Sequence, residues 1–149
     1  MVSRRARMLV AVAALAVAAC GQTGGETTRI DQAETEVTQI LDDIAEQLQI
    51  DADEVDEFGQ PNPCELVTTG TGWSNNVSLR TEVPDVDDPI GRSSAVLVDA
   101  GYQLVDSEEE LGEGVFGRRD GIRITVVLDH ATDELAIDAH TGCRPAPST

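Results

Sequence analysis

Two predicted strands joined by Asp120-Gly121 constrain the fold of this chain more than any other segment. Residues 122–128 carry an apolar side chain at every second position, which is typical of a strand with one buried face. Asp-Gly between this strand and residues 115–119 predicts a tight turn of the primed type. The segment therefore predicts an antiparallel hairpin near the C-terminal end of the domain.

Further elements surround this hairpin. Residues 77–83 and 135–139 alternate in the same way, and 102–105 are typical of a short strand. Residues 64–67 are compatible with a short strand or a helical turn, and the glycine-rich triplet 70–72 predicts a turn.

Two segments predict helices. Residues 31–49 repeat apolar positions at steps of three and four, with Asp31 and Glu34 spaced as a capping box. Residues 89–100 begin with Asp88-Pro89 and end before Gly101, which are typical start and stop signals. The order of elements predicts an α+β fold: a two-layer domain with an antiparallel sheet of about 4–5 strands and two helices on one face.

The N-terminus has the pattern of an export signal. Three arginines precede an uncharged apolar run at 8–19, and Cys20 follows small residues. The run is too short for a membrane span of roughly 20 residues. The segment resembles the signal peptide and lipobox of prokaryotic lipoproteins, which implies cleavage before Cys20 and acylation, such as palmitate, on its thiol. Arg4-Arg5 also fits a twin-arginine signal in part, but Arg7 stands where that pattern wants an apolar residue, so we favour general secretion.

The predicted organisation follows from this signal. Residues 1–19 are the signal peptide, 20–30 a lipidated flexible tether, 31–143 one α+β domain and 144–149 a disordered tail. We expect the protein on the extracytoplasmic face of the cell membrane, anchored by lipid.

The charge of the chain is strongly negative. Its formal net charge is −18, and loss of three arginines with the signal would make it −21. Every basic residue other than histidine is arginine. Such a surface argues against nucleic-acid binding, because the phosphate backbone is also negative. The composition fits a GC-rich genome, or adaptation to high salt.

Three cysteines are present, and lipid on Cys20 would leave Cys64 and Cys143. An even remainder in an exported chain indicates one disulfide. Two free thiols are the alternative. A metal site is less favoured, although His140 lies three residues before Cys143. We expect no cofactor and no dedicated metal site.

Catalytic signatures are absent from the sequence. His130 lies between Asp129 and Asp133, and His140 lies near Asp138. A nucleophile for either histidine would come from Ser74, Ser78 or Thr141, but no local motif supports such a triad. A concave pocket that holds one of these histidines beside a hydroxyl would favour a hydrolase.

Other candidate sites are less specific. The spacing of Asp51, Asp53 and Asp56 does not match a calcium loop. The clusters 85–88 and 108–110 favour no more than weak, unspecific binding of divalent cations. Trp73, the single tryptophan, is either a core residue or an exposed recognition residue.

Residues 96–144 resemble small lipoproteins of high-GC Gram-positive, actinobacterial type. The features that match are Asp99-Ala100-Gly101-Tyr102, a hairpin containing Arg119-Asp120-Gly121, and a final strand followed by Thr141-Gly142-Cys143-Arg144-Pro145. The resemblance implies an envelope location and a Cys64–Cys143 disulfide. It supplies no catalytic residue.

The expected function is that of a membrane-anchored lipoprotein that acts as a non-enzymatic binding module, with an envelope protein as its partner. The alternative is a carrier of an apolar or lipid ligand, which needs a cavity of several hundred Å³ between helices and sheet. A filled interface between these layers would count against the carrier.

Overall fold

The computed structural model describes residues 28–51, 57–67, 70–105 and 113–147. The predicted signal peptide, Cys20, most of the predicted tether and the acidic segment 106–112 lie outside these ranges. Among the described residues, no helix is both long enough and apolar enough to cross a membrane.

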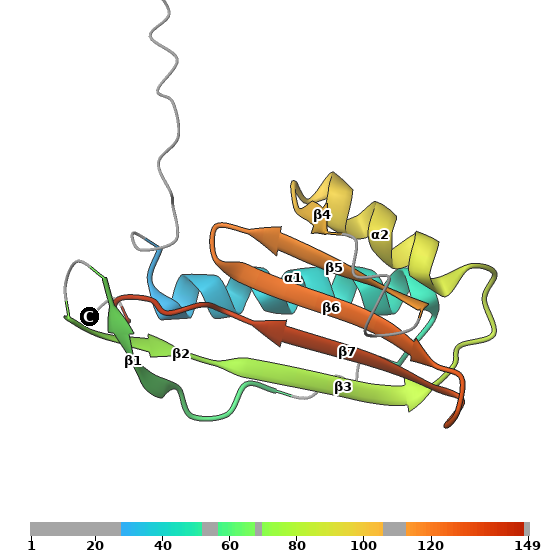
Figure 1. Ribbon diagram of the computed structural model, residues 1–149, viewed down its shortest axis with the longest axis horizontal. Coiled ribbons are helices and arrows are strands. Elements are labelled where there is room, and N and C mark those ends of the chain that lie inside the picture. Colours follow the sequence, from blue (N-terminus) through green and yellow to red (C-terminus); the bar gives the residue numbers. More distant parts are fainter. Residues whose placement is uncertain (1–27, 52–56, 68–69, 106–112, 148–149) are drawn as a thin grey trace, which may run out of the picture.

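The fold has the predicted α+β class. A five-stranded antiparallel sheet has the order β3-β7-β6-β5-β4, and two helices pack on one of its faces (Figure 1). The strands of this sheet are β3 (Asn76–Glu82), β4 (Gln103–Val105), β5 (Glu113–Arg119), β6 (Ile122–Asp129) and β7 (Glu134–His140). The helices are α1 (Ile30–Leu48) and α2 (Pro89–Asp99).

The predicted hairpin is confirmed in detail. Arg119 pairs with Ile122 across the turn. Asp120 and Gly121 have φ of 48° and 82°, so both central residues are left-handed, as a primed turn requires. This turn sets the register of β5 against β6, and hence which residues of both strands face the helices.

One correction concerns the start of α1. Ile30, expected at the end of the tether, is the first helical residue and is buried. Gln32 Oε1 accepts the Arg29 N–H at 3.2 Å, so Arg29 and Gln32 occupy the capping positions two residues before those predicted. The helix therefore starts where its apolar stripe starts.

A second correction concerns residues 62–74. They form a separate two-stranded antiparallel sheet of β1 (Asn62–Leu66) and β2 (Gly70–Ser74). Gly70 and Gly72, expected in a turn, are strand residues. A Cβ on Gly72 would lie 2.9 Å from Cys143 Sγ, so glycine is present here because the chains approach closely rather than because the chain turns.

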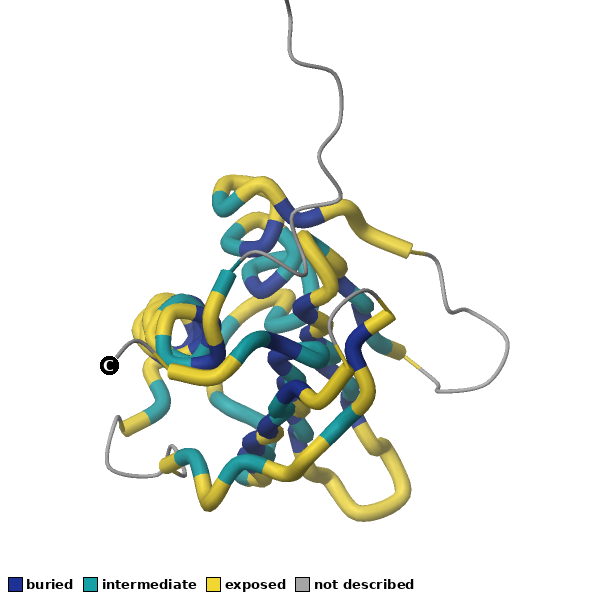
Figure 2. Tube along the Cα trace, turned by 90° about the vertical axis from the view of Figure 1, so that its left-hand side faces the viewer, coloured by how far each residue is buried: buried dark blue, intermediate teal, exposed yellow. Residues whose placement is uncertain are grey.

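The core lies between the helices and the five-stranded sheet. Alternate residues of β3, β6 and β7 point into it, and buried positions alternate with more exposed ones along the strands (Figure 2). Ala33, Val37, Ile44, Leu48, Leu97, Ile124, Val126 and Leu135 have exposed fractions of 0%.

Cys64 and Cys143 form a disulfide, as predicted. Cys64 of β1 and Cys143, three residues after β7, are joined with an S–S distance of 2.03 Å. The bond fastens the small β1–β2 sheet to the end of the large sheet.

The C-terminal segment 144–147, expected to be disordered, instead packs on the domain. Arg144 is 1% exposed and bridges Trp73 through two backbone hydrogen bonds of 2.8 Å. Pro145 O accepts the Ile30 N–H at 3.1 Å. This segment thus ties β2 to the first turn of α1.

Candidate functional site

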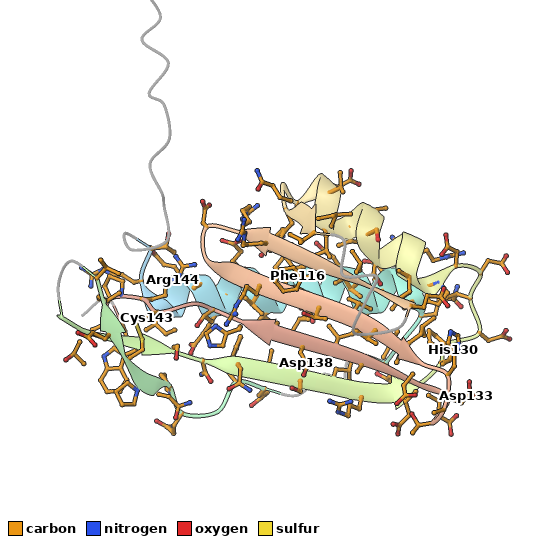
Figure 3. The ribbon with its side chains drawn as sticks, viewed as in Figure 1. Phe116, His130, Asp133, Asp138, Cys143 and Arg144 are labelled. Atoms are coloured by element: carbon orange, nitrogen blue, oxygen red, sulfur yellow. A yellow bond between two sulfur atoms is a disulfide. The ribbon has the colours of Figure 1, made fainter. Side chains whose placement is uncertain are left out.

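On the sheet face turned away from the helices, side chains from several strands meet. Register places Ser78, Asp138, Thr125 and Phe116 in one row across β3, β7, β6 and β5. Figure 3 views the sheet with α1 behind it, and Phe116 and Asp138 project from two of these strands. We call the surface formed by this row and the neighbouring outward-facing residues of the same strands the open face.

A shallow concavity of about 340 Å³ lies at one end of the open face. It has a mixed lining of apolar and hydrogen-bonding groups. Besides two residues whose side chains face the core, the lining residues are Asn76, Ser78, Phe116, Arg123, Thr125, Asp138 and His140.

This concavity brings together three residues that the sequence singled out: Ser78, Asp138 and His140. Ser78 Oγ donates a hydrogen bond to Asp138 Oδ1. His140 Nδ1 accepts the Gly142 N–H at 2.9 Å. A histidine beside a hydroxyl in a pocket is the arrangement that would favour a hydrolase. The hydrogen bonds of His140 and Ser78 decide whether the two residues can act together in catalysis.

Those hydrogen bonds do not form a catalytic relay. An acceptor Nδ1 means that the neutral His140 ring carries its proton on Nε2. In this state the imidazole has no lone pair left to take a proton from Ser78, and Asp138 does not orient it. Burial and the neighbouring Arg123 lower the pKa of His140, which favours the neutral ring.

His130 is far from this concavity. It follows β6 whereas His140 ends β7, and these strands are antiparallel, so the two histidines lie at opposite ends of the sheet. His130 Nε2 lies 2.9 Å from Glu113 Oε2, and both side chains are exposed. Asp129, its predicted partner, instead accepts the Ala131 N–H at 2.8 Å, which lowers the pKa of Asp129.

The other hydroxyl candidates have different surroundings. Thr141 is fully buried, and its Oγ1 accepts the Asn75 N–H at 2.9 Å, so it fixes the junction of β2 and β3. Ser74, in β2, is not among the residues that line the concavity. The sequence pattern alone could not separate Thr141 from Ser78, because the burial of Thr141 depends on its contact with Asn75, which lies 66 residues away in the chain.

The acidic cluster 85–88 does not converge. Asp88 caps α2 by accepting the Gly91 N–H at 2.9 Å, while Asp87 O accepts from Arg92 Nε at 2.8 Å. Within the described parts of the chain, no three His, Cys, Asp or Glu residues are grouped to hold a metal ion. Residues 108–110 and Asp53 and Asp56 lie outside the described residues.

A second concavity, of about 440 Å³, lies between α1 and α2. Its acidic lining residues are Glu36, Asp43, Glu46 and Asp99, and Arg119 closes one end by pairing with Glu36. Tyr102 OH donates to Glu36 Oε1 at 3.2 Å, and the Arg119 guanidinium lies 5.1 Å from the centre of the Tyr102 ring. The cluster of Glu36, Tyr102 and Arg119 joins β5 and α1.

Trp73 is half-buried, between the two roles expected for it. Its backbone pairs with Arg144 beside the Cys64–Cys143 disulfide, so its strand belongs to the C-terminal junction. No sequence signal indicated that Arg144 is buried, since a basic residue in a proline-rich tail is typical of an exposed segment.

Comparison with known proteins supplies no relative from which function can be transferred. No family model matches the chain, and neither the curated proteins nor the solved structures contain a significant match.

Proposed function

We propose that the chain is a lipoprotein, anchored through Cys20 to the extracytoplasmic face of the cell membrane, that acts as a non-enzymatic binding module. Its binding surface is the open face of the five-stranded sheet. The observation that carries the proposal is this face: both helices cover the opposite side, and the centre of the open face presents Phe116, Val127 and Ala136 between charged ends.

The charge of the chain supports a lipid anchor. A net charge of −18 opposes adsorption to anionic headgroups, so lipid on Cys20 would be needed to hold the domain at a membrane. The segment between Cys20 and the start of α1 at Ile30 would separate the domain from the bilayer. This spacing leaves the open face accessible to a partner.

A binding role also agrees with the hydrogen bonds of the concavity. The hydroxyl of Ser78 is engaged with Asp138, and the second ring nitrogen of His140, Nε2, is a donor. These groups suit recognition by hydrogen bonding rather than proton abstraction.

The carrier alternative receives no support from the core. Residues of α1, α2, β6 and β7 that meet there, including Ile44, Leu97, Ile124 and Leu135, are 0% exposed. Neighbouring atoms cover their surfaces completely, so no cavity of ligand size adjoins them.

Two experiments test the proposal in cells. Metabolic labelling with an alkyne analogue of palmitate should mark the wild-type chain and leave Cys20→Ser unlabelled. A photo-crosslinking amino acid at position 116 should give adducts in intact cells, whereas the same probe at Asp42, exposed on α1, should not. Unlabelled wild-type protein would refute the anchor, and equal crosslinking at both positions would refute the open face as the binding surface.

A further inference from the structure

We propose that the partner of the open face is the open face of a second copy of this chain, related to the first by a two-fold axis. This inference deepens the proposed function by naming the partner. It rests on that function in one respect, because it uses the same open face as the binding surface. It follows from how the strand register distributes charge across the face.

One end of the open face is basic. Arg123 of β6 pairs in register with His140 of β7 on one side and with Arg118 of β5 on the other. Arg118 and Arg123 are exposed, and His140 is half-buried with Nε2–H as a donor. Three donor side chains therefore lie in one row across three neighbouring strands, in a chain whose net charge is −18.

The other end is acidic. Glu134 of β7 pairs in register with Glu82 of β3 and with Asp129 of β6. All three carboxylates are exposed. Arg123 and Asp129 lie near the two ends of β6, so the basic and acidic rows are about 20 Å apart.

A two-fold axis that lies in the interface and runs across the strands exchanges these ends. Each strand then faces the same strand of the second copy, and the two facing strands run in opposite directions. Arg123 then lies opposite Asp129 of the second copy, and His140 lies opposite Glu134 of the second copy. Symmetry repeats both pairs, as an isologous interface requires.

The same operation matches shapes at the centre of the face. Phe116 lies opposite Gly114 of the second copy, because the axis crosses β5 at Val115, midway between these two residues. Gly114 pairs with Val127, whose Cγ2 lies 3.0 Å from the position that a Cβ of Gly114 would take, so the ring packs on this apolar side chain of the second copy. Thr125 lies opposite Val127 of the second copy, so small and large side chains alternate across the interface.

The area is close to the lower limit for a specific dimer. The five strands hold 7, 3, 7, 8 and 7 residues, which at about 4.8 Å between strands and roughly 3.4 Å per residue give roughly 520 Å² for one copy. Two copies would bury roughly 1,000 Å², about the minimum expected of a specific interface. A relative rotation of about 30° between the sheets, usual for aligned packing, still pairs the rows.

A second copy fits this charge pattern better than a polyanion or a polycation. A polyanion would meet the row of Glu82, Asp129 and Glu134, and a polycation would meet Arg118 and Arg123. At physiological ionic strength the Debye length is about 8 Å, so facing charges contribute more than the distant net charge. In the dimer, the basic row of each copy faces the acidic row of the other, so both ends of the open face meet opposite charge.

Charge reversal tests the arrangement. The full chain, in density-matched detergent at physiological salt, should sediment as a dimer. Arg123→Glu should weaken dimerisation at least about tenfold, because it places a carboxylate opposite Asp129 of the second copy. The double variant Arg123→Glu/Asp129→Arg should restore the dimer, whereas Asp42→Arg on the solvent side of α1 should leave dimerisation unchanged.

A second rescue guards against misfolding. Asp129 accepts the Ala131 N–H in the turn, so Asp129→Arg also removes a local hydrogen bond. Glu134→Arg, at an exposed neighbour in the same row, should rescue Arg123→Glu at least in part. Circular dichroism of each variant establishes that it is folded.

A monomeric wild-type chain would overturn the dimer, and so would folded double variants that both remain as weak as Arg123→Glu. If the chain is monomeric and crosslinks from position 116 join it to a different protein, the dimer is wrong and the proposed binding surface stands. If the probe at position 116 gives no adduct and the chain is monomeric, both proposals fail.

Discussion

Tyr102 donates its hydroxyl to Glu36 Oε1 at 3.2 Å, and so links the residue that precedes β4 to the middle of α1. Tyr102 is the only tyrosine of the chain and is 4% exposed. Burial, followed by the negative charge of Glu36, raises the pKa of Tyr102 above its ordinary value of 10.0. The contact therefore has a spectroscopic signature that belongs to one residue.

We predict that Glu36→Gln lowers the pKa of Tyr102, because it removes the carboxylate that opposes tyrosinate. The measurement is tyrosinate absorbance during an alkaline titration of folded protein. Since the folded pKa is raised, Tyr102 stabilises the fold below its ordinary pKa of 10.0, and this contribution is lost as pH rises through the folded pKa. Glu46→Gln, elsewhere on α1, is the control and should leave the titration unchanged. An unchanged curve for Glu36→Gln would contradict the assigned cause.

Gly72 provides the second prediction. A Cβ there would lie 2.7 Å from Leu66 Cγ and 2.8 Å from Arg144 O. Gly72→Ala should therefore destabilise the fold by about 1–3 kcal/mol, as overpacking does. Gly59→Ala is the matched control: its Cβ would meet nothing within 4 Å, so the variant should be neutral or up to about 1 kcal/mol more stable. Chemical denaturation followed by Trp73 fluorescence measures both, and equal stabilities would refute the close contact.

The large sheet could be predicted from the sequence, whereas the role of Gly70 and Gly72 could not. The alternation in 77–83, 122–128 and 135–139 predicted the large sheet because burial of one face imposes a period of two. Glycine in 70–72 predicted a turn, but the close approach of Cys143 and Arg144 explains it instead. That approach depends on residues at the other end of the domain sequence, so no local pattern reveals it.

The geometry of the open face could not be predicted from the sequence either, because it depends on contacts between distant segments. The sequence singled out Ser78, Asp138 and His140 separately, but their association needs the register of β3 on β7 and β7 on β6. The hydrogen bond from Gly142 to His140 Nδ1 depends on how the chain bends after β7. Single residues were therefore predictable as candidates, whereas their arrangement was not.

The disulfide is the subject of the third prediction. Cys64 and Cys143 are 79 residues apart, and the chain-entropy model assigns about 4.5 kcal/mol of stability to closing a loop of this length. Cys64→Ala/Cys143→Ala should lower the free energy of unfolding by about this amount. A thiol reductant should destabilise the wild-type chain and leave the double variant unchanged. A loss below about 1 kcal/mol would show that the bond does not constrain the unfolded chain.

His140 leads to a pH-dependent prediction. Burial and Arg123 lower its pKa below the ordinary value of 6.5, so the unfolded state binds the proton more readily than the folded state. The stability contributed by neutral His140 is present above pH 6.5 and is lost as pH falls through the folded pKa. His140→Asn keeps an acceptor near the Gly142 N–H but does not titrate. Between about pH 7.5 and 5.5, thermal melts should therefore show a larger loss for wild type than for the variant, and parallel curves would contradict the prediction.

Arg144 is the subject of the last prediction. Its side chain is buried, with Nε donating to Thr141 O at 2.7 Å and Nη2 donating to Asp120 O, so it ties the C-terminal segment to the β5–β6 turn. Arg144→Ala would leave both carbonyls without this donor and open space beneath the segment. We expect a loss of about 3 kcal/mol in the free energy of unfolding.

The matched control for Arg144 is Arg80→Ala, which removes the same charge from an exposed position on β3, outside the two charged rows of the open face, and should change stability by no more than about 0.5 kcal/mol. Because charge loss is equal in the two variants, any difference between them measures burial and hydrogen bonding. Equal unfolding free energies would mean that the C-terminal segment does not hold the β5–β6 turn, and that the domain ends at Cys143.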